Sequence, residues 1–517
     1  MPFDRPGDLT EMIRYVTLRI GDAIEHHRLW ILLALALAGS VMLVERARAK
    51  PFWHDEVATI LASRLPIGTL WQASRDGLDL APPLNTMLTR VAHAVFSTGL
   101  VSTRLPPMFG FGLASLLLFV MVRARSNTLV GVAAALIPCF TGAFPYAYEA
   151  RGYAVAVGLF ALAIFGWSES AAGRHCVRNL SVMALALSAG VWTHYYAALA
   201  FLPIVVGELV RQIGGKRFDP SPWLALAAAA IGTLPLVPLV AAAAPQAATF
   251  WTRLEPSTLA STYDFILGAL DTRRFALGGG IVVILAIGEV IRRRRGSAPS
   301  SRQLAGHEVA AGLTTLAIPA VAMAIGSVAG RPFAPRYVLF AVVGFAAVIP
   351  LTTWRLTSNS SLADLVLCLT LLLPFAKDVA GSLEGVRFAS PNPLEGRPQL
   401  AQRLVGSDPI VLSAGLAYLQ FWYYMPADQR QHVVYVADPR SELRTTGTDT
   451  IDRGYLALAR WTPLAVVDYN TFVREHRAFH LYVCGSSWLG ARLREDRALI
   501  DRIGYELGCW LYRVRLP

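Results

Sequence analysis

The stretch LWILLALALAGSVMLVERARAKPFWHDE, residues 29–56, joins a long apolar run to three consecutive ionisable side chains. The run from Trp30 to Leu43 contains no charged residue and suits the interior of a membrane-spanning helix. His54, Asp55 and Glu56 follow near the point where such a helix reaches the membrane surface. The stretch therefore predicts a first transmembrane helix with two adjacent carboxylates close to its end.

The composition of the whole chain is that of a polytopic membrane protein. Of its 517 residues, 54% are hydrophobic and 16% are charged, and the mean hydropathy is +0.46. A soluble protein of this length is rarely so apolar. The net charge of +12 does not indicate a nucleic-acid partner, because many of the arginines stand in short loops between apolar runs, where membrane topology explains them.

Apolar segments of roughly 17 to 22 residues recur along the chain and predict about eleven transmembrane helices. They lie near residues 29–46, 104–123, 128–145, 151–168, 180–195, 196–212, 222–243, 274–291, 308–328, 336–353 and 360–378.

Arginine-rich loops set the expected orientation. A cytoplasmic N-terminus places most of them on the cytoplasmic side, as the positive-inside rule requires. An odd number of helices then carries the chain from about residue 383 to the opposite side. The protein is expected in the inner (plasma) membrane of a bacterium, with its C-terminal part in the periplasm or outside the cell. The loops in question contain Arg123 and Arg125, Arg174 and Arg178, Arg211 with Lys216 and Arg217, and Arg292 to Arg295.

Three regions follow from this topology. Residues 1–28 form a cytoplasmic segment, either an amphipathic helix along the inner surface or a loosely ordered tail. Residues 29–382 form the transmembrane domain, with a long outer loop at 47–103 in which Pro82 and Pro83 should start a short helix. Residues 383–517 are polar enough for a soluble domain on the outer side.

The C-terminal region alternates between strand and helix patterns. Strands are expected at 408–415, 431–438, 479–485 and 508–517, and helices at 415–425 and 490–506. This alternation predicts a small α/β domain with a partly parallel sheet. Cys484 and Cys509 are the only cysteines in this region; in an oxidising compartment they could form a disulfide, but free thiols are equally consistent with the sequence.

Two groups of ionisable residues fall on the outer side. Asp55 and Glu56 form the first group, and the sequence YAYEARGYA, residues 146–154, supplies Glu149 and Arg151 as the second. Either group alone could be a solvated loop charge. Both lie beside aromatic residues at the depth of lipid head groups, which favours a common site.

The order of short motifs resembles the C-type (GT-C) glycosyltransferases. It is most similar to the branch (family 39-like) that contains the protein O-mannosyltransferases and the bacterial aminoarabinose transferases of lipid A. The resemblance covers residues 29–353. Its motifs are W-H-D-E at 53–56, P-P-L at 82–84, R-L-P at 104–106, Y-E-A-R-G-Y-A at 148–154, T-H-Y-Y at 193–196 and P-R-Y at 335–337.

This resemblance implies an enzyme that moves a sugar, with inversion, from a polyprenyl-phosphate carrier to an extracytoplasmic acceptor, either a glycolipid, a polysaccharide or a protein. Asp55 matches the acid of the family's first outer loop and is expected to be the general base. Glu56 would position the acceptor or a metal ion. Glu149 would orient the acceptor or stabilise the positive charge that develops at the anomeric carbon.

Cationic and aromatic residues are expected to bind the substrates. Arg151 and Arg336 suit the donor phosphate, because a guanidinium matches phosphate oxygens. His194 would contact phosphate or sugar, although a structural hydrogen bond explains it equally well. Tyr153 and Tyr337 would line the site or anchor the protein at the interface.

The chain departs from its relatives at Ala81, where many have a lysine or histidine before the two prolines. Metal dependence is therefore open; if a divalent ion binds, His54, Asp55 and Glu56 are its expected ligands. A flippase or other transporter of lipid-linked sugars is the alternative function. Transporters keep ionisable residues near the membrane midplane, whereas the acidic residues here gather at one face, which favours a transferase.

Overall fold

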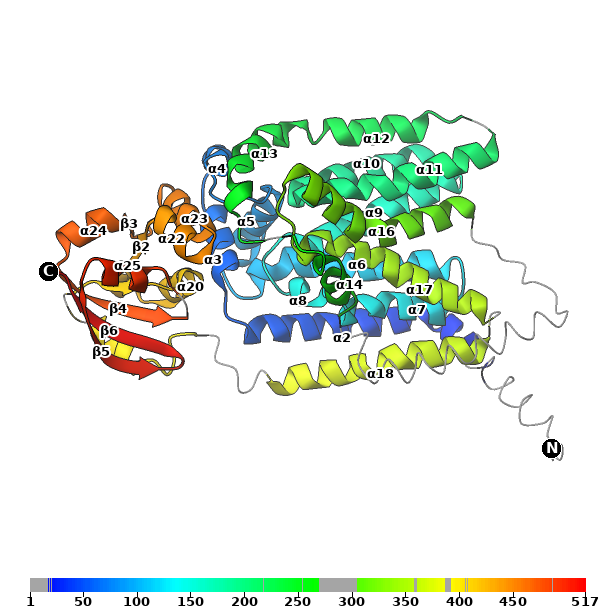
Figure 1. The fold of residues 1–517 in the computed structure, drawn as a ribbon. Coiled ribbons are helices and arrows are strands. Elements are labelled where there is room, and N and C mark those ends of the chain that lie inside the picture. The colour runs from blue at the N-terminus through cyan, green and yellow to red at the C-terminus, as the bar shows by residue number, and fades with distance from the viewer. Residues whose placement is uncertain are drawn as a thin grey trace.

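The computed structural model of the chain describes residues 21–268, 305–385 and 392–517, apart from the isolated positions 217, 253, 358, 359, 405, 407 and 486, together with Thr17 and Arg19. Long helices form a bundle, and a smaller domain with a six-stranded sheet lies at one end of it (Figure 1). The predicted fold class, a polytopic helical protein with a C-terminal α/β domain, is confirmed. Most of the predicted N-terminal segment 1–28 lies outside the described residues.

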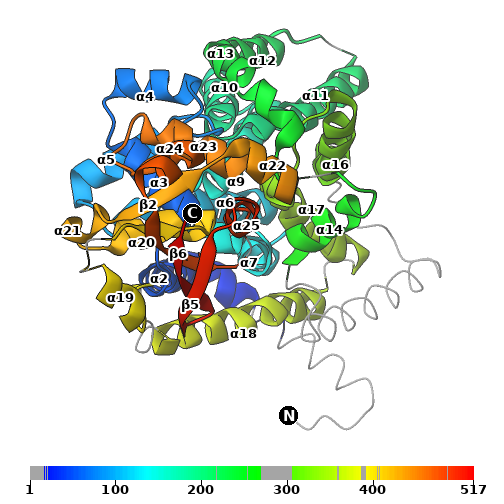
Figure 2. The same ribbon diagram turned by 60° about the vertical axis from the view of Figure 1, so that its left-hand side comes forward.

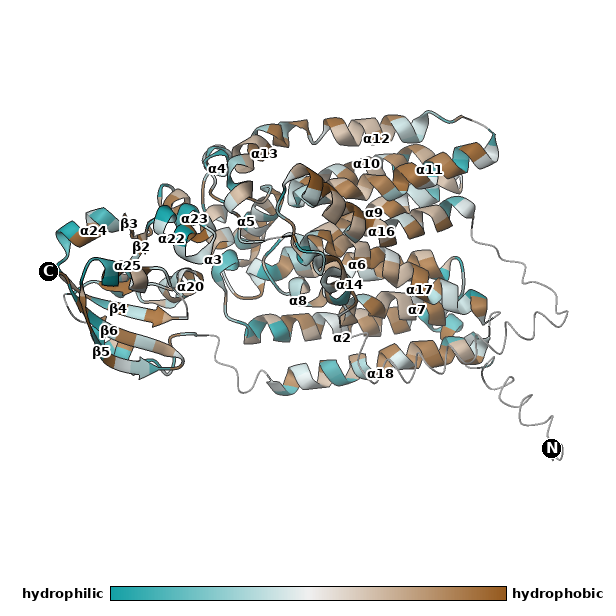
Figure 3. Cartoon of the chain, in the orientation of Figure 1, coloured by the Kyte–Doolittle hydropathy of each residue, from teal (hydrophilic) through white to brown (hydrophobic). Residues whose placement is uncertain are grey.

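Apolar residues cover the helices of the bundle, whereas the C-terminal domain is more hydrophilic (Figure 3). Among the described residues, eight helical segments are long and apolar enough to cross a membrane. They are Arg28–Ala49, Ser102–Arg123, Tyr153–Ala171, Cys176–Thr193, Tyr195–Gly215, Ser221–Thr249, Gly306–Ala329 and Pro335–Leu356.

Eight of the eleven expected spans therefore have a counterpart, and the other three differ. The segment expected at 128–145 forms a shorter apolar helix, Thr128–Phe140. The segment at 360–378 belongs to a helix of 25 residues, Ser361–Gly385, which is not among the eight. The segment at 274–291 lies outside the described residues.

The helices of the bundle are α2 (Arg28–Ala49), α6 (Leu105–Arg123), α7 (Thr128–Leu136), α9 (Tyr153–Ala171), α10 (Cys176–Thr193), α11 (Phe201–Gly215), α12 (Ser221–Ile231), α13 (Val237–Ala243), α16 (Gly306–Ala329), α17 (Val342–Leu356) and α18 (Ser361–Gly385). Shorter helical segments connect them: α8 (Phe144–Ala147), α14 (Thr258–Leu267), and the 3₁₀ turns η1 (Ser102–Arg104), η2 (Ile137–Phe140), η3 (Tyr195–Ala200), η4 (Leu234–Leu236), η5 (Ala244–Thr249) and η7 (Pro335–Ala341).

The long outer loop folds into three helices, α3 (His54–Ser63), α4 (Ile67–Arg75) and α5 (Leu84–Phe96). They lie at the end of the bundle that faces the C-terminal domain (Figure 1). Pro83 immediately precedes α5, as the sequence predicts, because its fixed φ angle suits a helix start and it needs no amide donor there.

The C-terminal domain has a mixed sheet in the order β3-β2-β1-β4-β6-β5. The first four of these strands pair in parallel, and β6 pairs antiparallel with β4 and β5. The strands are β1 (Ile410–Leu412), β2 (Val433–Ala437), β3 (Val466–Asp468), β4 (Ala478–Cys484), β5 (Leu499–Glu506) and β6 (Cys509–Arg515); the helices are α19 (Pro398–Arg403), α20 (Gly415–Tyr424), α21 (Ala427–Arg430), α22 (Pro439–Thr446), α23 (Thr450–Ala459), α24 (Tyr469–Glu475) and α25 (Leu489–Glu495).

The helix expected at 490–506 is wrong in its second half. It ends at Glu495, and Arg497 adopts a left-handed φ of 58°, which interrupts the helix. Residues 499–506 then form β5, an edge strand whose exposed polar residues hide its strand pattern. Cys484 and Cys509 face each other across β4 and β6 and form a disulfide.

One apolar cluster joins the outer loop to the C-terminal domain. Phe52, Val57 and Leu61, from the start of the loop, pack into the same core as Tyr418 and Trp422 of α20. Figure 2 shows α20 and α23 close to α3 when the domain is turned toward the viewer. The domain therefore rests directly on the segment that carries Asp55.

Candidate active site

A buried ion pair fixes the first turn of α3. Glu56 and Arg104 are both fully buried, and the guanidinium bonds both carboxylate oxygens, with Nε to Oε1 and Nη2 to Oε2 at 2.7 Å each. Glu56 Oε1 also accepts the Ala150 amide at 2.8 Å. This geometry is a bidentate, fully hydrogen-bonded pair, the arrangement in which burying two charges is tolerated.

Arg104 also binds backbone carbonyl groups at the end of α2. Its Nη1 donates to the carbonyl oxygens of Ala47 and Lys50 at 2.6 and 2.7 Å, and its Nη2 donates to that of Pro51 at 3.2 Å. The last turn of α2, the start of α3, the start of α6 and the 149–151 segment therefore meet at one buried guanidinium. Glu56 was expected to be catalytic; both of its oxygens are committed to this anchor.

Asp55 lies on the other side of the same helical turn. Its side chain is 25% exposed, and 3.9 Å separate Asp55 Oδ1 from His54 Nε2. The opposite ring nitrogen of His54, Nδ1, lies 3.0 Å from the hydroxyl of Tyr455 in α23. Burial lowers the pKa of His54, so the ring is neutral at pH 7 and does not neutralise Asp55.

The side chain of Glu149 is almost completely buried and lies close to Asp55. Its Oε2 accepts a hydrogen bond from Lys50 Nζ at 2.7 Å, while its Oε1 is buried and has no hydrogen-bond partner among the described residues. Burial raises the pKa of Glu149, the charge of Lys50 opposes this, and the charges of Glu56 and Asp55 reinforce it. One carboxylate oxygen is thus left for a proton or a ligand.

Arg151 is anchored by an acid that the sequence did not suggest. Its Nη1 donates to Asp79 Oδ2 at 3.0 Å and to Thr59 Oγ1 at 3.3 Å. Asp79 comes from the loop between α4 and α5, and Thr59 lies one turn along α3 from Asp55. These contacts hold Arg151 beside the outer loop, where the Asp55 charge acts on it.

Arg336 stands in an aromatic environment. Its Nε donates to the Tyr153 hydroxyl at 3.1 Å, and its guanidinium lies 4.8 Å from the ring centre of Trp251 and 5.9 Å from that of Tyr337. No carboxylate lies within salt-bridge distance of it in the described part of the chain.

The predicted histidine completes this aromatic group. The ring of His194 lies 4.9 Å from that of Tyr337 and 5.3 Å from that of Tyr153. Its Nδ1 accepts a hydrogen bond from the backbone amide of Tyr196 and caps η3, so the structural role considered from the sequence is present.

The structure brings the expected residues together from four parts of the chain. Arg151 bonds Thr59, one turn along α3 from Asp55, and the Ala150 amide, between Glu149 and Arg151, bonds Glu56 of the same turn. Arg336 joins this neighbourhood through its bond to Tyr153, two residues after Arg151. Lys50, Asp79 and Arg104 belong to the site but were missed. Their partners are 99, 72 and 48 positions away, and no local pattern marks such pairs.

The expected metal ligands do not form a set. No group of three His, Cys, Asp or Glu side chains converges as a metal site in the described ranges. Glu56 is turned inward to Arg104, which leaves His54, through Nε2, and Asp55 as two of the three expected ligands. These residues do not fit a divalent ion as a shared ligand set.

Comparison with known proteins shows which solved structures share this fold. No protein-family model and no curated protein sequence matches the chain. The apo structure of ArnT from Cupriavidus metallidurans matches it with a TM-score of 0.56 at 12% identity, over 94% of this chain and 97% of ArnT. The chain has the fold of ArnT. The structure of ArnT bound to undecaprenyl phosphate matches with a TM-score of 0.55 at 16% identity, over 94% of this chain and 98% of ArnT.

ArnT is a C-type glycosyltransferase, so the resemblance drawn from the order of motifs is confirmed for the fold. The match to ArnT includes both the helical bundle and the C-terminal domain, because it spans almost the full length of both chains. The motif order had covered only residues 29–353.

Proposed function

We propose that this chain is an integral-membrane glycosyltransferase that takes a sugar from a polyprenyl-phosphate carrier and transfers it to an acceptor outside the cytoplasm. The fold is shared with ArnT, one structure of which contains undecaprenyl phosphate. We further propose that it lies in a bacterial inner membrane, with residues 392–517 on the outer side, as the arginine distribution favours.

One observation carries the proposal. A partly exposed carboxylate, Asp55, shares a neighbourhood with a guanidinium, Arg336, that has aromatic neighbours and no salt-bridge partner among the described residues. Such a cation suits a phosphate that leaves with the lipid, and such a carboxylate suits a hydroxyl that arrives from water.

The proposed reaction is a single displacement. Asp55 takes the proton of the acceptor hydroxyl while the oxygen of that hydroxyl bonds to the anomeric carbon. The bond from the anomeric carbon to the phosphate oxygen breaks at the same time. The lipid phosphate departs as an anion paired with Arg336, so no general acid is required. Attack from the face opposite the phosphate inverts the anomeric configuration.

The remaining residues support this step. Glu56 acts as a positioning residue, because its pair with Arg104 sets the orientation of the helical turn that bears Asp55. Glu149, with its free Oε1, orients the acceptor or stabilises developing positive charge. Arg151, His194, Tyr153 and Tyr337 bind the donor.

The test uses the purified full chain in lipid vesicles with a panel of undecaprenyl-phosphate sugars and a cell-envelope extract, followed by mass spectrometry. Wild type should consume one donor and glycosylate one extracted molecule. Asp55→Asn should lower turnover about 10²–10⁴-fold while the protein stays folded. Asp76→Asn, an exposed acid of the same loop, is the matched control.

Wild-type turnover by Asp55→Asn would exclude this carboxylate as the base. If no donor were consumed and intact carrier lipid instead moved between leaflets, the alternative function, transport of a lipid-linked sugar, would replace the proposal.

A further inference from the structure

A cavity lies at the end of the bundle away from Asp55. It has a volume of about 380 Å³ and lies between α6, α9, α16 and α17. Helices α6 and α9 begin near the candidate active site, just after Arg104 and at Tyr153, and line the cavity with their C-terminal parts, from Met121 and from Phe160 onward. The cavity is therefore separate from the site that holds Asp55.

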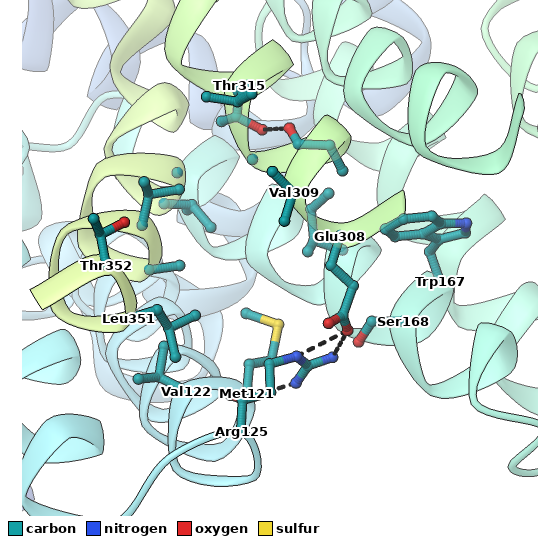
Figure 4. A pocket seen from close by; sticks show the side chains of 18 of the residues that line it. Met121, Val122, Arg125, Trp167, Ser168, Glu308, Val309, Thr315, Leu351 and Thr352 are labelled. Atoms are coloured by element: carbon teal, nitrogen blue, oxygen red, sulfur yellow. Dashed lines mark hydrogen bonds and ion pairs between the residues drawn. The ribbon is translucent and has the colours of Figure 1, made fainter. Parts of the chain in front are cut away.

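The walls of this cavity are apolar, and its charged residues are confined to one end. Figure 4 shows Arg125 and Glu308 paired at that end, with Val122 and Leu351 on the walls. Arg125 Nε donates to Glu308 Oε1 at 2.8 Å. Arg355, from the last turn of α17, also lines the cavity. Two arginines and one glutamate are the charged residues of the lining.

The cavity is open toward the bilayer. Leu313 of α16 and Leu356 of α17 line it and are 59% and 44% exposed, so the opening lies between these two helices. An apolar cavity stays dry, and an empty one forfeits the dispersion contacts of its walls. A bilayer offers alkyl chains to fill such a space.

Its depth corresponds to one leaflet. The lining of α9 runs from Ser168 to Phe160, which is ~12 Å along a helix that rises ~1.5 Å per residue. The hydrocarbon core of a bilayer is ~30 Å thick, so the cavity reaches less than halfway across. An acyl chain whose head group lies at the end with the arginines fits this depth.

We propose that the cavity is a binding site for an anionic glycerophospholipid. One acyl chain lies between α16 and α17, and the phosphate lies near Arg355 and the Arg125–Glu308 pair. In the topology expected from the arginines this end faces the cytoplasmic leaflet, where basic pockets between helices bind anionic head groups. The proposal does not depend on the reaction assigned to Asp55.

The experiment is native mass spectrometry of the delipidated full chain, titrated with phosphatidylglycerol or phosphatidylcholine. Wild type should retain one phosphatidylglycerol molecule at dissociation energies that remove all other bound lipid molecules. It should prefer phosphatidylglycerol over phosphatidylcholine by about fivefold, the effect of roughly 1 kcal/mol per cationic side chain. Equal retention of both lipids, or of neither, would overturn the proposal.

Three variants locate the site. Ala347→Leu and Val348→Phe add side-chain volume at two lining positions and should each remove the retained lipid. Ala228→Leu, at an exposed position of α12, is the matched control and should retain it. Arg355→Gln should keep the lipid but lose the preference for phosphatidylglycerol. Thermal unfolding checks that each variant is folded; retention by both filled variants would place the lipid elsewhere.

A competition arm separates the phospholipid from the carrier. Undecaprenyl phosphate added in excess should leave the retained phosphatidylglycerol in place, because the carrier's phosphate is expected at the opposite end of the bundle. Displacement of phosphatidylglycerol would show that the cavity accepts the carrier instead, and would contradict the proposal.

Discussion

Asp55 and Glu56 leave the first turn of α3 about 100° apart, as successive residues of an α-helix do. That rotation turns Glu56 into the bundle, where Arg104 binds it, and leaves the side chain of Asp55 a quarter exposed. The sequence does not distinguish the two carboxylates, since no local pattern shows which of them pairs with Arg104, 48 positions away. Only the packed structure separates an anchoring acid from one available for chemistry.

Arg336 provides a test at the same scale. Arg336→Ala should raise the KM for the lipid-linked donor about 10- to 100-fold, because a charge-assisted hydrogen bond is worth about 1.5–3 kcal/mol. The kcat at saturating donor should fall less. Arg331→Ala, an exposed arginine five residues earlier, serves as the control. A KM close to that of wild type would remove Arg336 from the donor site.

At the scale of elements, α23 of the C-terminal domain touches α3 beside Asp55, the proposed base. The Tyr455 hydroxyl lies 3.0 Å from His54 Nδ1, and His54 stands next to Asp55. The domain therefore contributes to the orientation of the proposed base and does more than cover the outer loop.

Removing this contact should slow the enzyme without unfolding it. Tyr455→Phe removes the bond to His54 together with the bond that the hydroxyl donates to the Gly415 carbonyl inside the domain. Loss of the His54 bond, worth about 0.5–1.5 kcal/mol, should lower kcat about 3- to 10-fold and leave the donor KM nearly unchanged. Tyr435→Phe, which loses a buried bond to Asp452 instead, controls for damage to the domain core. Equal losses of kcat in both variants would indicate a general effect on the domain.

A second contact between elements makes the domain sensitive to pH. Burial, reinforced by the Asp452 charge, raises the pKa of Glu442 in α22 to about 8 from its usual 4.5. The folded domain then holds a proton that the unfolded chain releases above pH 4.5, so this contribution to stability is lost as pH rises toward 8. Thermal unfolding from pH 5 to 9 should show the decline, and Glu442→Gln should flatten it.

The exposed Glu475 in α24 supplies the control for that measurement, since Glu475→Gln should leave the pH profile of wild type unchanged. A profile that declines equally steeply in Glu442→Gln would assign the pH dependence to other groups.

At the scale of the whole molecule, the sequence predicted what depends on local composition. Long apolar runs located eight spans, and alternating patterns located β1, β2, β4 and β6. The prediction from the sequence was wrong at β5, where a helix was expected, because an edge strand with Asp501 and Arg502 exposed resembles the polar face of a helix. It also missed the pairing of Lys50 with Glu149 and of Asp79 with Arg151, since distant partners meet only after packing.

The orientation of the bundle remains a prediction that one native cysteine can test. Cys176 is exposed and unpaired at the start of α10, at the end of the bundle away from Asp55, whereas Cys139 and Cys368 are less accessible. In spheroplasts, a membrane-impermeant maleimide should label Cys176 only after permeabilisation. It should label Asp76→Cys, made in a Cys176→Ser background, before permeabilisation, because α4 and its C-terminal residue lie beside the candidate active site. The reverse pattern would place Asp55 and the C-terminal domain in the cytoplasm, where the Cys484–Cys509 disulfide would not persist.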